Sequence, residues 1–341
     1  MNKISIQNST KTLSNNKTIC IDCGLWDTKT VYIRNPKDNN YIMATKESLT
    51  PSDFFYIIVS CNNCNSIFLH PNYFEESFSV YNSKRYFTGY FPNNIHTGGG
   101  PNFTPHPFTY YSRLVYKRKA HSLLKSAGLL KHKRIRVIDI GCGRGNLVQG
   151  FLDNGCDAYG VDTSLIAFKS RIKNIKVIHG NYEKPLFQND YFDLIVSIQT
   201  FEHMASLEKI MNQIKKTLKS NSLLIIEVPN DIEGYRVKLF KNIWWMIPPI
   251  HIRYFTRQSV KNIFSNFDFR VINITTSGSL GGDLTSIFIY NLKKMHMGRW
   301  TNSLFIKIFK QFVKYFFFPF DVLLNVYRNH SEMRIILRKE T

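Results

Sequence analysis

A glycine-rich turn preceded by a carboxylate is the first feature of this sequence that could support chemistry. The turn follows a short apolar run, and the residues that define it are Asp139, Gly141, Gly143 and Gly145. Glycines let the backbone approach a ligand closely at the end of a strand. Asp162 ends the next apolar run, where its carboxylate can accept hydrogen bonds from both hydroxyls of a ribose. An ordinary tight turn would explain the glycines alone, whereas the whole constellation indicates that adenosine is recognised.

Two departures separate this turn from the dinucleotide-binding fingerprint. That fingerprint has a third glycine where Asn146 stands, and it does not normally place a carboxylate at the position of Asp139. Both departures count against NAD as the ligand.

Two Cys-x-x-Cys pairs near the N-terminus are the second feature, formed by Cys20, Cys23, Cys61 and Cys64. Each spacing brings two sulfurs to one side of a tight turn, so the pairs supply the two halves of a tetrahedral four-sulfur site. Disulfides are disfavoured because we expect a reducing compartment. The pairs therefore predict a structural Zn²⁺ ion, and unligated thiols are the alternative.

Candidate acid–base groups form the third feature. Glu202 and His203 follow the apolar run 192–198, and His251 follows an aromatic and proline-rich segment, residues 244–250. An unperturbed histidine titrates near neutrality, so His251 is a candidate general base for a hydroxyl or amine acceptor. The alternatives are structural: a helix-terminal Glu202 beside a satisfied histidine, and a His251 that only packs.

The apolar runs predict the elements that position these residues. A helix over residues 112–130 precedes short runs typical of buried strands, at residues 135–140, 158–161, 175–178, 192–198 and 223–228. Helical periodicity alternates with these runs, and such βαβ alternation implies a parallel sheet covered by helices on both faces. Two further strands are predicted at residues 269–275 and 333–338. We therefore expect an α/β fold, a Rossmann-like, doubly wound and mostly parallel sheet, with a small N-terminal four-cysteine zinc-ribbon module.

Composition divides the chain into three regions. Residues 1–90 hold the cysteine pairs and form the expected zinc-binding module, residues 91–111 are rich in Gly, Pro and Asn and predict a linker, and residues 112–341 form the second domain. Hydrophobic residues make up 43% of the chain and charged residues 20%, the balance of a packed protein. The polar N-terminus lacks the apolar region of a signal peptide, so we expect a cytoplasmic location.

Residues 137–147 resemble the first motif of the class I S-adenosylmethionine-dependent methyltransferases, an aspartate followed by a Gly-x-Gly-x-Gly turn. The similarity covers about residues 112–280 and includes His179-Gly180-Asn181, residues 191–196, Phe201-Glu202-His203-Met204 and Val228-Pro229-Asn230. The resemblance implies that Asp139 and the glycines hold the methionine part of S-adenosylmethionine, that Asp162 binds its ribose and that Asn181 lies near its adenine.

Two smaller segments carry further resemblances. Residues 61–71 are similar to the second knuckle of zinc-ribbon-fronted methyltransferases, with Asn65 in place of the usual glycine. Asparagine tolerates the left-handed backbone conformation, so this replacement is mild. His251, Tyr254 and Phe255 resemble the His-x-x-Tyr-Phe segment of a methyltransferase subgroup that modifies glycans and small molecules.

Together the resemblances imply a methyltransferase that acts on a sugar or related small molecule in surface-glycan biosynthesis, with His251, Glu202 and His203 as its catalytic candidates. An RNA methyltransferase is an alternative, because a net charge of +21 and a zinc module suit a polyanion. However, residues 199–202 lack the Asn/Asp-Pro-Pro-aromatic signature of amino methylation, and nucleic acid is not the expected partner. A noncatalytic module that binds S-adenosylmethionine or zinc is the third reading.

An amphipathic insertion at about residues 285–330 needs its own explanation. One helical face can carry Leu304, Phe305, Ile308, Phe309, Phe312 and Phe316, and another Lys307, Lys310 and Lys314. A basic amphipathic helix can lie on an anionic membrane, which would place the protein peripherally at the inner membrane surface. The lysines exclude a spanning helix. The apolar face could instead pack on the protein's own sheet or on a second subunit of a homo-oligomer.

Overall fold

The computed structural model describes residues 20–22, 28–33, 57–70, 110–132, 134–234, 251–278, 280, 284–285, 308–309, 312–313, 315–326 and 330–340. Cys23, the aromatic and proline-rich segment 244–250 and the expected linker up to residue 109 lie outside these residues.

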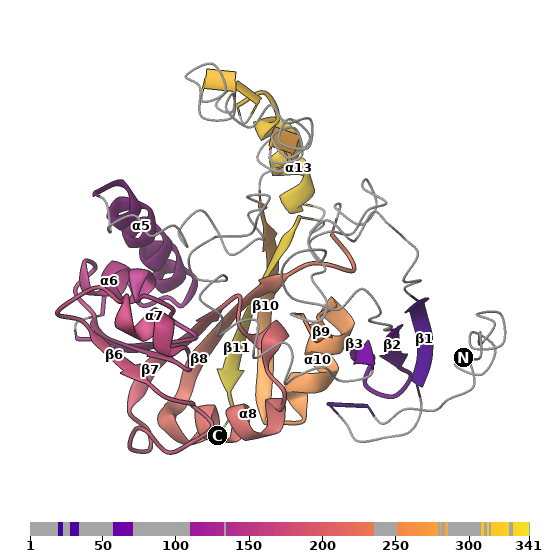
Figure 1. Ribbon diagram of the computed structural model, residues 1–341, viewed down its shortest axis with the longest axis horizontal. Coiled ribbons are helices and arrows are strands. Elements are labelled where there is room, and N and C mark those ends of the chain that lie inside the picture. The colour runs from indigo at the N-terminus through magenta and orange to yellow at the C-terminus, as the bar shows by residue number, and fades with distance from the viewer. Residues whose placement is uncertain are drawn as a thin grey trace, which may run out of the picture.

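A seven-stranded sheet forms the centre of the molecule, with the strand order β10-β11-β8-β7-β4-β5-β6 (Figure 1). Its strands are β4 (Arg136–Ile140), β5 (Asp157–Asp162), β6 (Lys176–His179), β7 (Phe192–Ile198), β8 (Leu218–Pro229), β10 (Phe269–Ser277) and β11 (Glu332–Lys339). The neighbours β6, β5, β4, β7 and β8 run parallel, and β11 runs antiparallel to both β8 and β10. The order reverses direction between β4 and β7, as in a doubly wound Rossmann-like fold. The predicted fold class is confirmed.

Alternation along the central strands divides the core into two layers. In β8, Leu223 and Ile225 belong to one buried cluster, whereas Leu224 and Ile226 belong to the other. Successive side chains of a strand point to opposite faces of a sheet. Near-continuous apolar strands of this kind require helices on both faces, because either face would otherwise expose apolar surface to water.

Among the described residues, five helices provide this cover: α5 (Tyr110–Ser126), α6 (Asn146–Leu152), α7 (Leu165–Lys169), α8 (Leu207–Thr217) and α10 (Arg257–Ser265). Residues of α5 and α6 pack in one cluster, and residues of α8 and α10 pack in the other. Side-chain caps fix several helix starts: Ser206 accepts from the Lys209 amide, and Thr256 and Ser259 form a reciprocal capping box at α10. Such caps satisfy amides that have no partner within the helix.

A second, four-stranded antiparallel sheet joins distant parts of the chain in the order β1-β2-β3-β9. Its strands are β1 (Thr28–Ile33), β2 (Ile57–Cys61), β3 (Ile67–His70) and β9 (Arg253–Tyr254). β9 comes from the segment after residue 112, so the cysteine-bearing strands and the larger domain share this sheet (Figure 1). Asn65 adopts φ 59° in the tight turn between β2 and β3, as its tolerance of the left-handed conformation predicts.

Candidate functional site

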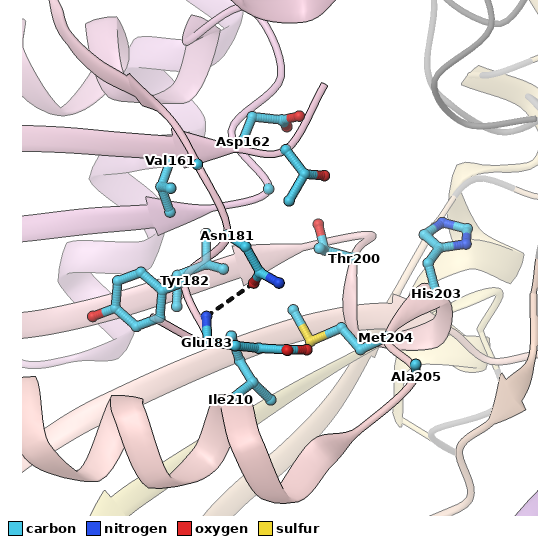
Figure 2. A pocket seen from close by; sticks show the side chains of 14 residues that line it. Val161, Asp162, Asn181, Tyr182, Glu183, Thr200, His203, Met204, Ala205 and Ile210 are labelled. Carbon is cyan, nitrogen blue, oxygen red and sulfur yellow. Dashed lines mark hydrogen bonds between the residues drawn. The ribbon is translucent and has the colours of Figure 1, made fainter. Parts of the chain in front are cut away.

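A pocket opens at the edge of the large sheet where the parallel strands end. Its empty space, counted together with the open mouth, is about 750 Å³. It is lined by Ile140, Gly141, Val161, Asp162, Thr163, Gly180, Asn181, Tyr182, Glu183, Thr200, His203, Met204, Ala205 and Ile210 (Figure 2). Ligands of doubly wound folds bind at this edge, near the point where the strand order reverses.

The glycine turn after β4 is held by the carboxylate of Asp162. Gly141, Gly143 and Gly145 all have positive φ, of 78°, 54° and 83°. The Gly143 amide donates a 2.8 Å hydrogen bond to Oδ2 of Asp162, and the Ser164 amide donates a 2.8 Å hydrogen bond to Oδ1. A carboxylate oxygen has two acceptor sites, so Asp162 keeps one on each oxygen for a ribose diol.

Burial raises the pKa of Asp162 above its ordinary value, although the two amide hydrogen bonds oppose this shift. Asp139 is also buried, at 3% exposure, and is not among the residues that line the pocket. Burial, together with the negative charges of Asp162 and Glu227, raises the pKa of Asp139 well above its ordinary value. Its Oδ1 atom has no hydrogen-bond partner among the described residues. A buried carboxyl without a partner, close to the glycine turn, is compatible with a ligand that brings a cationic group, such as a sulfonium or an amine, to this turn.

Asn181 lines the pocket, and its side-chain oxygen accepts a 2.9 Å hydrogen bond from the Glu183 amide (Figure 2). This bond orients the amide group within the pocket. Tyr182 and Ile210 also line the pocket and provide apolar surface, as a flat aromatic ligand requires. The pocket residues therefore fit an adenosyl group at three points: a diol acceptor, an amide and an apolar wall.

Glu202, His203 and His251 come together beside the pocket. Phe201–His203 form a short 3₁₀ helix after β7, and His203 reaches the pocket wall (Figure 2). The rings of His203 and His251 have centroids 5.0 Å apart, and Nε2 of His203 lies 3.6 Å from Oε1 of Glu202. The structure thus brings together all three predicted catalytic candidates. Glu202 and His203 are neighbours in the sequence, whereas His251 comes from a later segment.

Sequence reasoning missed Asp231, which orients His251. Nδ1 of His251 lies 3.3 Å from Oδ2 of Asp231, and both residues are buried. Burial alone would lower the pKa of His251, but the hydrogen bond with Asp231 and the negative charges of Asp231 and Glu202 outweigh it, so the pKa is raised. Asp231 lies two residues after the end of β8, and its place shortly after a predicted strand was a signal that could have singled it out.

Glu202 is a buried carboxyl with an unusual titration. It is 1% exposed, and neither of its side-chain oxygens has a hydrogen-bond partner among the described residues. Burial raises its pKa to about 7, although the nearby His251 opposes this shift. One ligand atom from each of Glu202, His203 and His251 lies within 4.8 Å of the others, so the trio could also hold a divalent metal ion, which two imidazoles and a carboxylate suit.

A buried ion pair connects this cluster to the cysteine-bearing strands. Nε of Arg253 donates to Asp22 at 2.9 Å, and Nη1 donates to the Met204 carbonyl at 2.6 Å. The side chains of Arg253 and Asp22 are 0% and 1% exposed. Ile252, which lies between His251 and Arg253, forms two backbone hydrogen bonds of 3.0 Å. Its amide donates to the Glu202 carbonyl, and its carbonyl accepts from the Leu69 amide of β3. The position of His251 therefore depends on contacts with both sheets.

The cysteine cluster contains three of the four predicted metal ligands. The sulfurs of Cys20, Cys61 and Cys64 lie within 4.8 Å of one another, and Cys20 and Cys64 are separated by 3.5 Å. Zinc–sulfur bonds of about 2.3 Å in a tetrahedron place neighbouring sulfurs roughly 3.8 Å apart, so this spacing fits a zinc ion. All three cysteines are buried and none forms a disulfide. Cys23 lies outside the described residues, so the fourth ligand stays a prediction.

Strand order, glycine turn and pocket define a Rossmann-like domain with a site for an adenosyl ligand, and comparison with known proteins names its family. Residues 111–274 match the model of a family described as a methyltransferase domain. This segment is a class I, S-adenosylmethionine-dependent methyltransferase domain, as its resemblance predicts. It includes every predicted cofactor-binding and catalytic residue, whereas the cysteine cluster lies outside it.

Three individual relatives each share 28% sequence identity or less with this chain. An uncharacterized protein of Methanocaldococcus jannaschii is 28% identical over 171 residues, which cover 48% of this chain and 73% of the relative. A ubiquinone biosynthesis O-methyltransferase of Pelagibacter ubique is 28% identical over 111 residues, and the match covers 29% of this chain and 43% of that enzyme. The crystal structure of a SAM-dependent methyltransferase from Archaeoglobus fulgidus is 21% identical, with a TM-score of 0.46, and covers 68% of this chain and 100% of its own.

Proposed function

We propose that this protein transfers a methyl group from S-adenosylmethionine to a hydroxyl group of a sugar-type small molecule, in the biosynthesis of a surface glycan. The observation that carries the proposal is the buried Asp231–His251 pair beside His203, which lines the adenosyl pocket. This arrangement provides a base next to a methyl-donor site, as transfer to a hydroxyl requires.

The chain's own residues would hold the methyl donor in a fixed place. Asp162 would bind the ribose hydroxyls, and Asn181, Tyr182 and Ile210 would contact the adenine. The glycine turn, of which Gly141 lines the pocket, would hold the methionine part. S-adenosylmethionine, when bound, supplies an electrophilic methyl group on a sulfonium. The displacement requires the acceptor oxygen, the methyl carbon and the sulfur to lie in a line, so holding both reactants in this orientation provides much of the rate acceleration.

His251 would receive the proton that the acceptor loses. With Nδ1 donating to Asp231, the Nε2 atom of neutral His251 carries the free lone pair. The acceptor oxygen forms a bond to the methyl carbon while the carbon–sulfur bond breaks, and the hydroxyl proton passes to Nε2. The hydrogen bond with Asp231 and the negative charges of Asp231 and Glu202 stabilise the resulting imidazolium, and the pKa of His251 is therefore raised despite its burial.

Two lines of support bear on the acceptor. Relatives named ubiquinone biosynthesis O-methyltransferase and malonyl-[acyl-carrier protein] O-methyltransferase favour an oxygen acceptor. The sugar type is supported by the resemblance of His251, Tyr254 and Phe255 to a glycan-modifying subgroup. In this chain Tyr254 and Phe255 are buried at 2% and 1% exposure, so they would shape the position of His251 and not contact an acceptor.

Radiolabelled S-adenosylmethionine tests the proposal against a panel of acceptors: nucleotide sugars, polyprenylated quinone precursors, malonyl-acyl carrier protein and bulk RNA. A methyl ether survives mild alkali, whereas a methyl ester is hydrolysed, so the stability of the label separates ether-forming acceptors from malonyl-acyl carrier protein. Labelling of the nucleotide sugars would support the proposal, and labelling only of RNA, of the quinone precursors or of the ester-forming acceptor would overturn it.

The variant His251→Ala tests the base. We expect kcat to fall by about 10²–10⁴-fold, with an unchanged affinity for S-adenosylmethionine, because the base acts on the acceptor. His121→Ala on the exposed side of α5 is the matched control, and it should leave turnover intact. Wild-type turnover of His251→Ala would return His251 to a structural role.

A further inference from the structure

Exposed apolar side chains are concentrated in one segment of the chain. Among the described residues, twelve large apolar side chains are exposed, and eight of them lie between residues 308 and 323. Six of these define what we call the aromatic arm: Phe312, Tyr315, Phe316, Phe318, Phe320 and Leu323, which are 49–74% exposed. Single exposed apolar residues are normal on a protein surface, but a contiguous group indicates an interaction site.

The aromatic arm is attached to the domain by a buried polar contact. It includes α13 (Phe318–Val326), which projects beyond the end of the sheet at which β10 ends and β11 begins (Figure 1). Asp321 accepts a 2.6 Å hydrogen bond from the Leu280 amide, and its Oδ1 lies 3.2 Å from Nε2 of His330. Asp321 and His330 are 8% and 0% exposed. The arm therefore turns a polar side to the domain and leaves its apolar side chains in solvent.

The sequence left open whether the apolar face of this segment binds a membrane, or packs on the protein's own sheet or on a second subunit. If the apolar face packed on the protein's own sheet, Phe312 and Phe316 would be buried, but they are 65% and 60% exposed. Their rings stack on each other with centroids 6.1 Å apart. Among the described residues, the arm's aromatic rings are thus partnered by each other and not by the core.

Charge distinguishes the two remaining candidate partners, a second copy of the chain and an anionic membrane. The sequence between residues 285 and 330 has one acidic residue, the buried Asp321, against seven basic ones, which are Lys293, Lys294, Arg299, Lys307, Lys310, Lys314 and Arg328. A second copy of a chain with net charge +21 would be repelled by this segment. An anionic bilayer complements both properties, since it attracts cations at its head groups and accepts aromatic and aliphatic side chains beneath them.

We infer that the aromatic arm docks the protein onto the surface of an anionic phospholipid membrane. Within the described residues no helix is long and apolar enough to cross a bilayer, so the arm would lie in the interface. The inference is independent of the acceptor proposed above, because it rests on the arm's exposure and charge alone.

The arm's base lies next to the candidate active site. Asn230 donates a 2.8 Å hydrogen bond from its side chain to the His330 carbonyl, and Asp231 is the following residue. The pocket and the arm belong to the same edge of the sheet, because β10 ends where the parallel strands β4, β5, β7 and β8 end. A docked arm would therefore present the Asp231–His251 pair close to the bilayer, where a lipid-linked acceptor would be found.

Vesicle sedimentation with the full chain tests this inference. We expect the wild type to sediment with vesicles of phosphatidylcholine and phosphatidylglycerol, and to be released by added salt and by omission of phosphatidylglycerol. The double variant Phe316→Asp, Phe320→Asp should bind these vesicles at least about ten-fold more weakly. Its matched control is Val115→Asp, Ile272→Asp, which adds the same two charges at exposed apolar positions elsewhere and should bind as the wild type does.

Calorimetric binding of S-adenosylmethionine by both double variants would verify that they remain folded. Failure of the wild type to sediment with the anionic vesicles would overturn the inference, as would equal loss of binding in the two double variants. It would also be overturned if light scattering gave a dimer that only the arm variant dissociates, because a second copy would then cover the arm. Arm-dependent retention on bulk RNA without retention on vesicles would assign the surface to nucleic acid instead.

Discussion

Replacing Gly143 with alanine should weaken cofactor binding without disrupting the turn that contains it. Gly143 has φ +54°, and no atom of the described residues lies within 4 Å of the position that the new methyl group would occupy. Forcing alanine into this left-handed conformation costs about 1–2 kcal/mol, and the protein adds no steric penalty. The methyl group would instead enter the open space beside the turn, where the resemblance to the family places the methionine part of S-adenosylmethionine.

Gly155 provides the matched control for this substitution. It has φ +81°, equally open surroundings and a place between α6 and β5, away from the pocket. Both alanine variants should therefore lower the free energy of unfolding by a similar amount, about 1–2 kcal/mol. Only Gly143→Ala should raise the Kd for S-adenosylmethionine, by about ten-fold or more, which corresponds to ~1.4 kcal/mol. Gly141→Ala should cost more stability than either, because its methyl group would overlap Thr200.

Calorimetric titration measures the Kd of each variant, and denaturant unfolding in the absence of ligand measures stability. Equal affinities of Gly143→Ala and Gly155→Ala would refute the argument that the turn cradles the cofactor. A stability loss in Gly143→Ala far above that in Gly155→Ala would refute the premise that the turn has open space beside it.

The other predictions concern the ribose, the metal and the base. Asp162→Ala should weaken binding of S-adenosylmethionine by about 1.5–3 kcal/mol, the contribution of a hydrogen bond to a charged group, and unchanged affinity in calorimetry would contradict the ribose assignment. Elemental analysis should find about one zinc per chain that is lost in Cys64→Ser and kept in Cys156→Ser, since metal binding and folding of such sites are coupled; a metal-free wild type would contradict this. A neutral His251 is needed to accept a proton, so activity should rise with pH through a pKa above 6.5, and Asp231→Asn should move this rise to lower pH while reducing the maximal rate; an unmoved profile would contradict the pairing.

Periodicity predicted the strands well where both faces are buried, and less well where a strand leaves the core. β7 has the expected bounds, 192–198, because every residue from Leu194 to Val196 is fully buried. β8 begins at Leu218, five positions before the predicted start at residue 223 (223 − 218 = 5). The added residues 219–222 are polar and partly exposed, so apolar periodicity could not indicate them.

The same distinction applies to the site. The glycine turn, Asp162 and Asn181 were predictable because a local motif fixes them at the ends of consecutive strands. Asp22 was not, because its partner Arg253 lies 231 positions away and the pair forms only when β3 and β9 come together. Asp231 falls between these cases: its place after a strand was visible, but its contact with His251 depends on the path of the intervening chain.

The shared sheet and the Asp22–Arg253 pair have a consequence for dissecting this protein by deletion. A fragment that begins at residue 110 would retain the whole methyltransferase domain by family match, but it would leave the guanidinium of Arg253 without its carboxylate. Removing one partner of a buried ion pair typically destabilises a protein by about 3–5 kcal/mol. The two-residue strand β9 would also lose its partner β3, and with it the backbone hydrogen bonds that join the two strands. Loss of turnover in such a fragment would report damage to the scaffold around His251, so the role of the cysteine-bearing strands is better tested by point substitution in the intact chain.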